Sequence, residues 1–142
     1  MKLPQSINVL FIAGFGPIVP GQASRKLYQE VLGLPLQGED YLNSNQVEGV
    51  KEFALWPLSQ AAETCFGQPT WPEHLPVPQA WLEFDVEDVE SATEILEAQG
   101  YQVLVSARKE PWGQTVTRFL SPEGILLGLS YTPWLRGEGP RP

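Results

Sequence analysis

The residues PWGQTVTRFLSPEGILLGL at positions 111–129 form the most informative pattern in this sequence of 142 residues. Between Thr115 and Leu120 the residue types suit a strand, in which successive side chains point to opposite faces of a sheet. The residues SPEG at 121–124 suit a tight turn, because proline fixes φ at the second position and glycine tolerates a left-handed exit. A second apolar run follows at 125–129. The pattern therefore predicts a β-hairpin of two antiparallel strands.

The sequence around this hairpin predicts the same order of elements twice. In the first half we expect a strand at 7–19, a helix at 22–32, and strands at 36–40, 43–47 and 50–58. In the second half we expect a strand at 80–86, a helix that begins near Asp88 or Ser91 and ends at Gly100, a strand at 103–108, and the hairpin. Helices are predicted from apolar residues at helical spacing, and strands from β-branched and aromatic runs between turn residues.

This repeat predicts the domain organisation. We expect a first βαβββ module at 1–66, which ends in a short helix over 58–65, and a second βαβββ module at 79–132. A proline-rich linker at 67–78 joins them, and it should be stiff because prolines fix φ and remove backbone donors. The tail at 133–142 is rich in Pro, Gly and Arg, and we expect it to be frayed.

Three segments resemble a known family. The Trp-Gly pair, aromatic strand, Ser-Pro-Glu-Gly turn and apolar strand of 111–129 resemble the last hairpin of the vicinal oxygen chelate superfamily, which includes glyoxalase I, extradiol dioxygenases and bleomycin-resistance proteins. Residues 27–34 are similar to the end of its first helix, and residues 84–92 to its strand-to-helix junction. The resemblance implies an α+β fold in which two βαβββ modules form curved mixed sheets around a cleft. It does not define the activity, because one fold hosts unrelated functions.

Metal-dependent members of this superfamily hold a divalent ion with His and Glu side chains that point into the cleft from four strands. Carried over one position at a time, the resemblance places Ala13, Trp81 and Gly128 at three of these positions. None of the three can coordinate a metal, so we expect neither a metal site nor another cofactor.

The fourth position falls near Glu52 or Ala54, because Glu52, Ala54 and Trp56 should share one face of their strand. An alternative therefore stays open. If the register at Trp81 is wrong by two residues, Glu83 replaces it, and Glu52 with Glu83 would form a two-carboxylate site for a divalent metal.

The sequence offers no clear nucleophile or histidine centre. His74 is the one histidine, and it lies in the expected linker, where a solvated loop residue is the simplest interpretation. Cys65 is the one cysteine, so no disulfide framework exists, and we interpret it as a buried thiol. A pair of the two would need the fold to bring them together and a third group to orient them.

Aromatic residues are the remaining candidates for a site. The sequence has five tryptophans, and large aromatic side chains either pack in cores or offer flat apolar surfaces that also attract cations. Trp81 stands at a ligand position, and Trp112 precedes a glycine in a loop over the expected cleft mouth. The candidate ligand-binding residues are Trp81, Trp112, Trp56, Glu83 and Arg118. Arg118 either contacts an anion in the cleft or faces outward, and the outward orientation is favoured on its largely apolar strand.

Composition and charge limit the partners. A net charge of −8 argues against nucleic acid, whose binding rests on basic residues, and suits cationic ligands. No apolar run is long enough to span a bilayer, and residues 1–5 lack a signal-peptide pattern, so we expect a cytoplasmic protein without a membrane partner. A homodimer is expected from the resemblance alone.

Three functional hypotheses follow. In the first, the protein resembles the bleomycin-resistance branch and binds a small hydrophobic or cationic molecule between aromatic walls, without metal and without catalysis. In the second, it is a metal-dependent lyase or dioxygenase of the same superfamily that uses carboxylate ligands. In the third, the ancestral pocket is filled by the protein's own side chains, with Trp81 plugging it. The missing ligand positions favour the first hypothesis.

Overall fold

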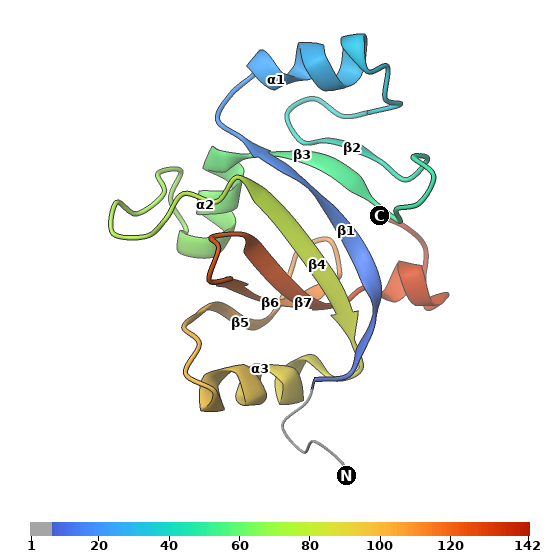
Figure 1. Ribbon diagram of the computed structural model, residues 1–142. Helices are drawn as coiled ribbons and strands as arrows, with labels where there is room; N and C mark the ends of the chain where they lie inside the picture. Colours follow the sequence, from blue (N-terminus) through green and yellow to red (C-terminus); the bar gives the residue numbers. More distant parts are fainter. Residues whose placement is uncertain (1–6) are drawn as a thin grey trace.

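One mixed sheet of seven strands runs through residues 7–142, the part of the chain that the computed structural model describes (Figure 1). The strands are β1 (Val9–Val19), β2 (Leu42–Ser44), β3 (Phe53–Pro57), β4 (Ala80–Val86), β5 (Val103–Lys109), β6 (Thr115–Leu120) and β7 (Leu126–Tyr131). Their order is β2-β3-β1-β4-β7-β6-β5. The expectation about a signal peptide concerns residues 1–5, which lie outside the described residues, and the cytoplasmic location stays a prediction.

The sheet joins the two halves of the chain through their first strands. β1 and β4 pair antiparallel at its centre, and each also pairs in parallel with the last strand of its own half, β3 or β7. The α+β fold that the resemblance implied is thus confirmed. The sheet curves and stays open, so one of its faces forms a hollow that both halves line.

Helices flank the sheet at both ends and on one side. α1 (Ala23–Arg25) continues into the π-helix η1 (Lys26–Val31), and Figure 1 shows this pair and α3 (Val89–Ala98) at opposite ends of the molecule. α2 (Leu58–Phe66) follows β3, and the 3₁₀ helix η2 (Pro133–Arg136) follows β7. The side chain of Asp88 caps α3 by accepting a hydrogen bond from the backbone of Ser91. No helix within residues 7–142 is long and apolar enough to cross a membrane.

The predicted hairpin forms at 115–131. β6 and β7 pair antiparallel, with Arg118 opposite Gly128. At the turn, the N–H of Gly124 donates to the carbonyl of Ser121 at 2.9 Å. Gly124 has a φ of +89°, so the left-handed exit that favours glycine is present.

The expected strand at 36–40 is wrong. In that segment Gln37 forms only an isolated bridge with Asn43. The chain turns back at Gly38, where φ is +110° and an added Cβ would lie 2.4 Å from the carbonyl oxygen of Tyr41. This close return leaves no room for an extended strand, and it brings Tyr41 to the edge of the hollow.

Alternation along β3 separates two packing layers. Leu55, with Phe53 beside it, packs on the face that η1 covers, whereas Ala54 and Trp56 pack on the opposite face with Trp81 and α2. The predicted register of 50–58 is therefore confirmed. α3 covers a further apolar cluster on β4, β6 and β7. The hollow lies on the face of the sheet that bears Trp56 and Trp81.

The tail at 133–142 begins with η2 and contacts the sheet through Arg136. Arg136 pairs with the fully buried carboxylate of Asp85, with Nε and Oδ2 2.9 Å apart. It also donates to the backbone carbonyl of Val86 at 2.6 Å. Because a buried carboxylate needs a partner, Asp85 holds the tail against β4.

Candidate functional site

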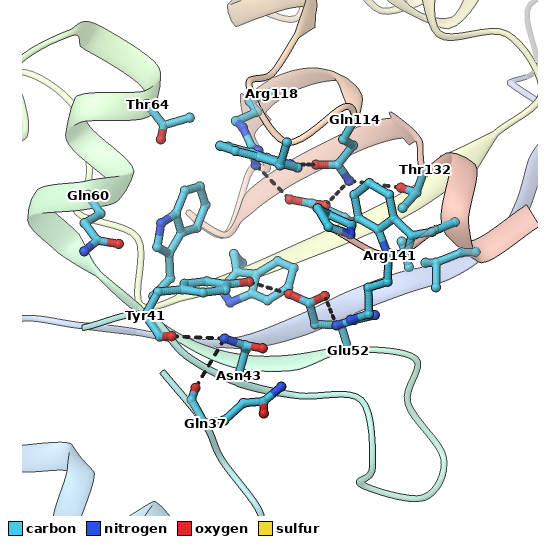
Figure 2. A pocket seen from close by; sticks show the side chains of 18 residues that line it. Gln37, Tyr41, Asn43, Glu52, Gln60, Thr64, Gln114, Arg118, Thr132 and Arg141 are labelled. Carbon is cyan, nitrogen blue, oxygen red and sulfur yellow. Dashed lines mark hydrogen bonds and ion pairs between the residues drawn. The ribbon is translucent and has the colours of Figure 1, made fainter. Parts of the chain in front are cut away.

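A cavity of about 500 Å³ occupies the hollow of the sheet (Figure 2). Its wall includes four tryptophans, Trp56, Trp81, Trp112 and Trp134. Figure 2 shows Arg118 and Gln114 on one side of it and Glu52 on the opposite side, with α2 along a third side. The volume lies within the range of small-molecule sites, which are mostly apolar with a few placed polar groups.

Glu83 and Arg118 form a buried ion pair at this cavity. Glu83 Oε2 and Arg118 Nη1 lie 2.8 Å apart, and only 2% of the Arg118 side chain is exposed. Gln114 Nε2 donates to the other oxygen of Glu83 at 2.9 Å. The expected outward orientation of Arg118 is therefore wrong. A buried carboxylate on β4 needs a countercharge, and Arg118 supplies it from β6, across β7.

Glycine at two positions makes room for the cavity wall. A Cβ added at Gly128 would lie 2.7 Å from Cγ of Glu83, and one added at Gly14 would lie 2.9 Å from the indole of Trp81. Trp81 and Glu83 thus share one face of β4, and both line the cavity. Gly128, which the resemblance places at a metal-ligand position, leaves space for the Glu83 side chain.

Trp81 belongs to the wall and leaves the cavity open. Its Nε1 donates to the carbonyl of Ala54 at 3.1 Å, and its ring meets Trp56 edge to face with 6.1 Å between the ring centroids. The guanidinium carbon of Arg118 lies 4.9 Å from the Trp56 ring centroid. One aromatic face of the wall is therefore already covered by a cation.

Glu52 lines the side of the cavity opposite Arg118 and Gln114. Its carboxylate accepts a hydrogen bond of 2.6 Å from the Tyr41 hydroxyl, and Arg141 Nη2 lies 3.0 Å from its other oxygen. Burial, and then the charge of Glu52, raises the pKa of Tyr41 well above its ordinary value. Tyr41 therefore stays protonated at neutral pH and acts as a donor.

Trp112 stands at the mouth. Its ring is 40% exposed, and its Nε1 donates to Gln114 Oε1 at 3.0 Å. Gln114 in turn donates to Thr132 as well as to Glu83, so it links the loop before β6 to the cavity wall. Trp134 and Arg141 reach the cavity from the tail.

All five candidate ligand-binding residues line the cavity, namely Trp81, Trp112, Trp56, Glu83 and Arg118. Sequence reasoning missed Tyr41, Gln114 and the tail. The signal that could have indicated the tail is Trp134 followed by two arginines in an acidic chain, since buried acidic groups elsewhere need such partners. Gln114 and Tyr41 carry no local signal.

The residues at the superfamily's metal positions do not fit a divalent ion. Ala13 and Gly128 offer no donor atom. Glu52 and Glu83 each pair with an arginine and accept a further hydrogen bond on the second oxygen. Two guanidinium groups beside the site also oppose another cation. Within residues 7–142 no group of three or more His, Cys, Asp or Glu side chains is placed to hold a metal.

His74 and Cys65 take no part in the cavity. His74 is exposed in the connection before β4, and Cys65 lies on the buried side of α2, in one core cluster with Trp71. Burial raises the pKa of the Cys65 thiol to about 11, so the thiol stays protonated at neutral pH. Neither residue forms a nucleophilic site.

Comparison with known proteins adds a family match. The sequence model of the Glyoxalase/Bleomycin resistance protein/Dioxygenase superfamily matches residues 21–129. The comparison with curated proteins gives no match.

Solved structures with this fold are also found. A superfamily member from Vibrio splendidus 12B01 shares 16% identity at a TM-score of 0.50, covering 88% of this chain and 98% of that one. A protein described as an NAD-dependent benzaldehyde dehydrogenase from Legionella pneumophila shares 13% identity at a TM-score of 0.56, covering 82% and 96%. A glyoxalase/bleomycin resistance protein/dioxygenase from Nocardioides shares 21% identity at a TM-score of 0.39, covering 96% and 90%. For the Vibrio and Legionella structures the likeness concerns the fold alone.

Proposed function

The chain belongs to the glyoxalase/bleomycin resistance protein/dioxygenase superfamily, and we propose that it is a member that binds a small aromatic molecule without metal and without catalysis. The observation that carries this proposal is the cavity of about 500 Å³, whose wall includes four tryptophans and two carboxylates that are each paired with an arginine. Membership alone does not define the ligand, because the fold hosts different chemistries.

The tryptophans favour an aromatic ligand. An indole ring is rigid and presents a large apolar surface, so it binds a flat molecule at a small entropic cost. Trp112 and Trp134 approach the cavity from loop and tail, and Trp56 and Trp81 from the sheet. Gln60 and Thr64 of α2 add hydrogen-bonding groups at one side, as Figure 2 shows.

The charges favour a hydrophobic ligand over a cationic one. Arg118 already occupies the face of Trp56 where a cationic ligand would stack. Glu52 and Glu83, the carboxylates on the cavity wall, are each paired with an arginine. A cation would therefore meet two guanidinium groups and no free carboxylate among these residues.

A metal-dependent lyase or dioxygenase is the second hypothesis from the sequence. It would need Glu52 and Glu83 as ligands, and both carboxylates are engaged by arginine. Elemental analysis of protein purified without chelator tests this point. We expect substoichiometric metal, and one bound divalent ion per chain would contradict the metal-free proposal.

Binding can be tested with phenylnaphthylamine, an uncharged aromatic dye, by calorimetric titration. We expect saturable binding to one site per chain, weakened roughly tenfold in Trp112→Ala, because the exposed ring at the mouth contributes stacking area. Tyr101→Ala is the matched control, since Tyr101 is a similarly exposed aromatic residue that does not line the cavity. Absence of saturable binding, or an equal effect of both variants, would contradict the proposal.

We also propose a homodimer, as the resemblance implied. Its support is a set of exposed apolar side chains on β1 and around η1, namely Leu10, Ile12, Phe15, Leu27, Val31 and Leu32. Such sets commonly mark protein interfaces. Ile12→Glu should give monomers in sedimentation velocity, whereas Val77→Glu, at an exposed apolar residue of the linker, should not. A monomeric wild type would refute the dimer.

A further inference from the structure

Arg118 has more donor capacity than the protein uses. A guanidinium carries five N–H groups. Among residues 7–142 the side chain of Arg118 donates one hydrogen bond, from Nη1 to Glu83 at 2.8 Å. Its Nε is buried and has no partner among these residues. A buried charged donor without an acceptor keeps its full desolvation cost, so native sites rarely leave one.

The surrounding network contributes no spare acceptor to Arg118. Glu83 accepts from Gln114 on Oε1 and from Arg118 on Oε2. The amide oxygen of Gln114 accepts from Trp112. Within the described part of the chain, the side-chain acceptors of Glu83 and Gln114 are therefore engaged, whereas Nε of Arg118 is not.

The position of Arg118 is fixed from two sides. Glu83 accepts a hydrogen bond from one guanidinium nitrogen, and the guanidinium carbon lies over the Trp56 ring, 4.9 Å from its centroid. Arg118 also lines the cavity. A planar fork that is already oriented loses little entropy when it binds a two-oxygen group, and such charge-assisted pairs are about twice as strong as neutral hydrogen bonds.

We propose that the ligand carries an anionic oxygen group, of the carboxylate or sulfonate class, which accepts hydrogen bonds from guanidinium N–H groups of Arg118 that Glu83 does not use. Arg118 is then a specificity-determining residue of the cavity. This inference rests on the proposed binding of an aromatic molecule and names the polar group on it. The net charge of −8 opposes an anion at long range, but salt screens that effect beyond about 10 Å, so the direct contact sets the affinity.

Two dyes with one aromatic skeleton separate this inference from the proposed function. Phenylnaphthylamine is uncharged, and anilinonaphthalene sulfonate adds one sulfonate to the same rings. We expect the wild type to bind the sulfonate at least roughly tenfold more tightly in calorimetric titrations. Equal affinity for both dyes overturns the inference and leaves the proposed function standing. Binding of neither dye overturns both.

Variants test whether Arg118 is responsible. Glu83→Gln combined with Arg118→Met removes both charges of the pair, so no buried charge is left alone, and we expect the preference for the sulfonate over the uncharged dye to be lost. Arg118→Lys keeps the charge without the fork and should lose most of the preference. Thermal melting checks that both variants fold. A preference that persists in either folded variant overturns the role of Arg118, and the wild-type comparison needs no variant.

Discussion

Gly128 determines how a charged pair fits beside the cavity. It lies opposite Glu83 in the parallel pairing of β4 and β7, and opposite Arg118 in the hairpin. A side chain here would meet Cγ of Glu83 at 2.7 Å and Val116 at 3.3 Å. Because Gly128 has no side chain, the side chains of Glu83 and Arg118 can meet over β7, the strand between theirs.

Gly128→Ala should consequently lower the free energy of unfolding by about 1–3 kcal/mol, the usual effect of overpacking a buried site. It should also weaken binding of both dyes, because Glu83 and Arg118 must move. Urea denaturation and calorimetric titration measure the two effects. Gly21→Ala is the control, since nothing lies within 4 Å of a Cβ added there. Similar values for both variants would show that Gly128 is not tightly packed.

At the level of elements, the tail is held by two arginines with different surroundings. Arg136 pairs with Asp85, whose side chain is fully buried, whereas Arg141 and Glu52 are 31% and 20% exposed. A buried pair that loses one partner leaves an uncompensated charge, and an exposed pair is compensated by water. Removal of Arg136 from its pair with Asp85 should therefore cost more stability than removal of Arg141 from its pair with Glu52.

Arg136→Ala should lower the free energy of unfolding by roughly 3 kcal/mol or more. Arg141→Ala should lower it by less than about 1 kcal/mol. Urea denaturation of both variants at one pH provides the comparison, and each serves as the control for the other. Equal losses would mean that Asp85 finds another partner when Arg136 is removed.

These elements also show what the sequence could predict. The hairpin, β4, α2 and α3 depend on local patterns, namely alternation, turn residues, caps and glycine ends, and local patterns are readable in one sequence. The tail and Arg118 depend on Asp85 and Glu83, which are distant in sequence. The inward orientation of Arg118 can be inferred only once the strand order is known, because that order places β6 two positions from β4, the strand of Glu83. The failed strand at 36–40 has one apolar side chain, Leu36, and Gly38 turns the chain back onto Tyr41.

For the molecule as a whole, two buried groups predict a loss of stability in alkali. Burial raises the pKa of Cys65 from 9.0 to about 11, and raises that of Tyr41 well above 10.0. Between these ordinary values and the raised ones the folded chain binds more protons than the unfolded chain. The free energy of unfolding therefore falls as the pH rises through this window.

Urea midpoints measured from about pH 8 to pH 11 should fall less steeply in Tyr41→Phe with Cys65→Ala than in the wild type. Below about pH 8 neither group titrates, so the two proteins should have parallel profiles there. If the urea midpoint of the variant falls with pH as steeply as that of the wild type, groups other than Tyr41 and Cys65 cause the loss of stability.

The edge-to-face contact of Trp56 and Trp81 has an optical consequence. Their ring planes meet at 81° with 6.1 Å between centroids, and both rings line the cavity. Two indole chromophores held so close at a fixed angle couple their electronic transitions, which produces a pair of opposite bands in circular dichroism. A colourless ligand that tilts either ring would change these bands, so the protein carries its own spectroscopic probe of the cavity.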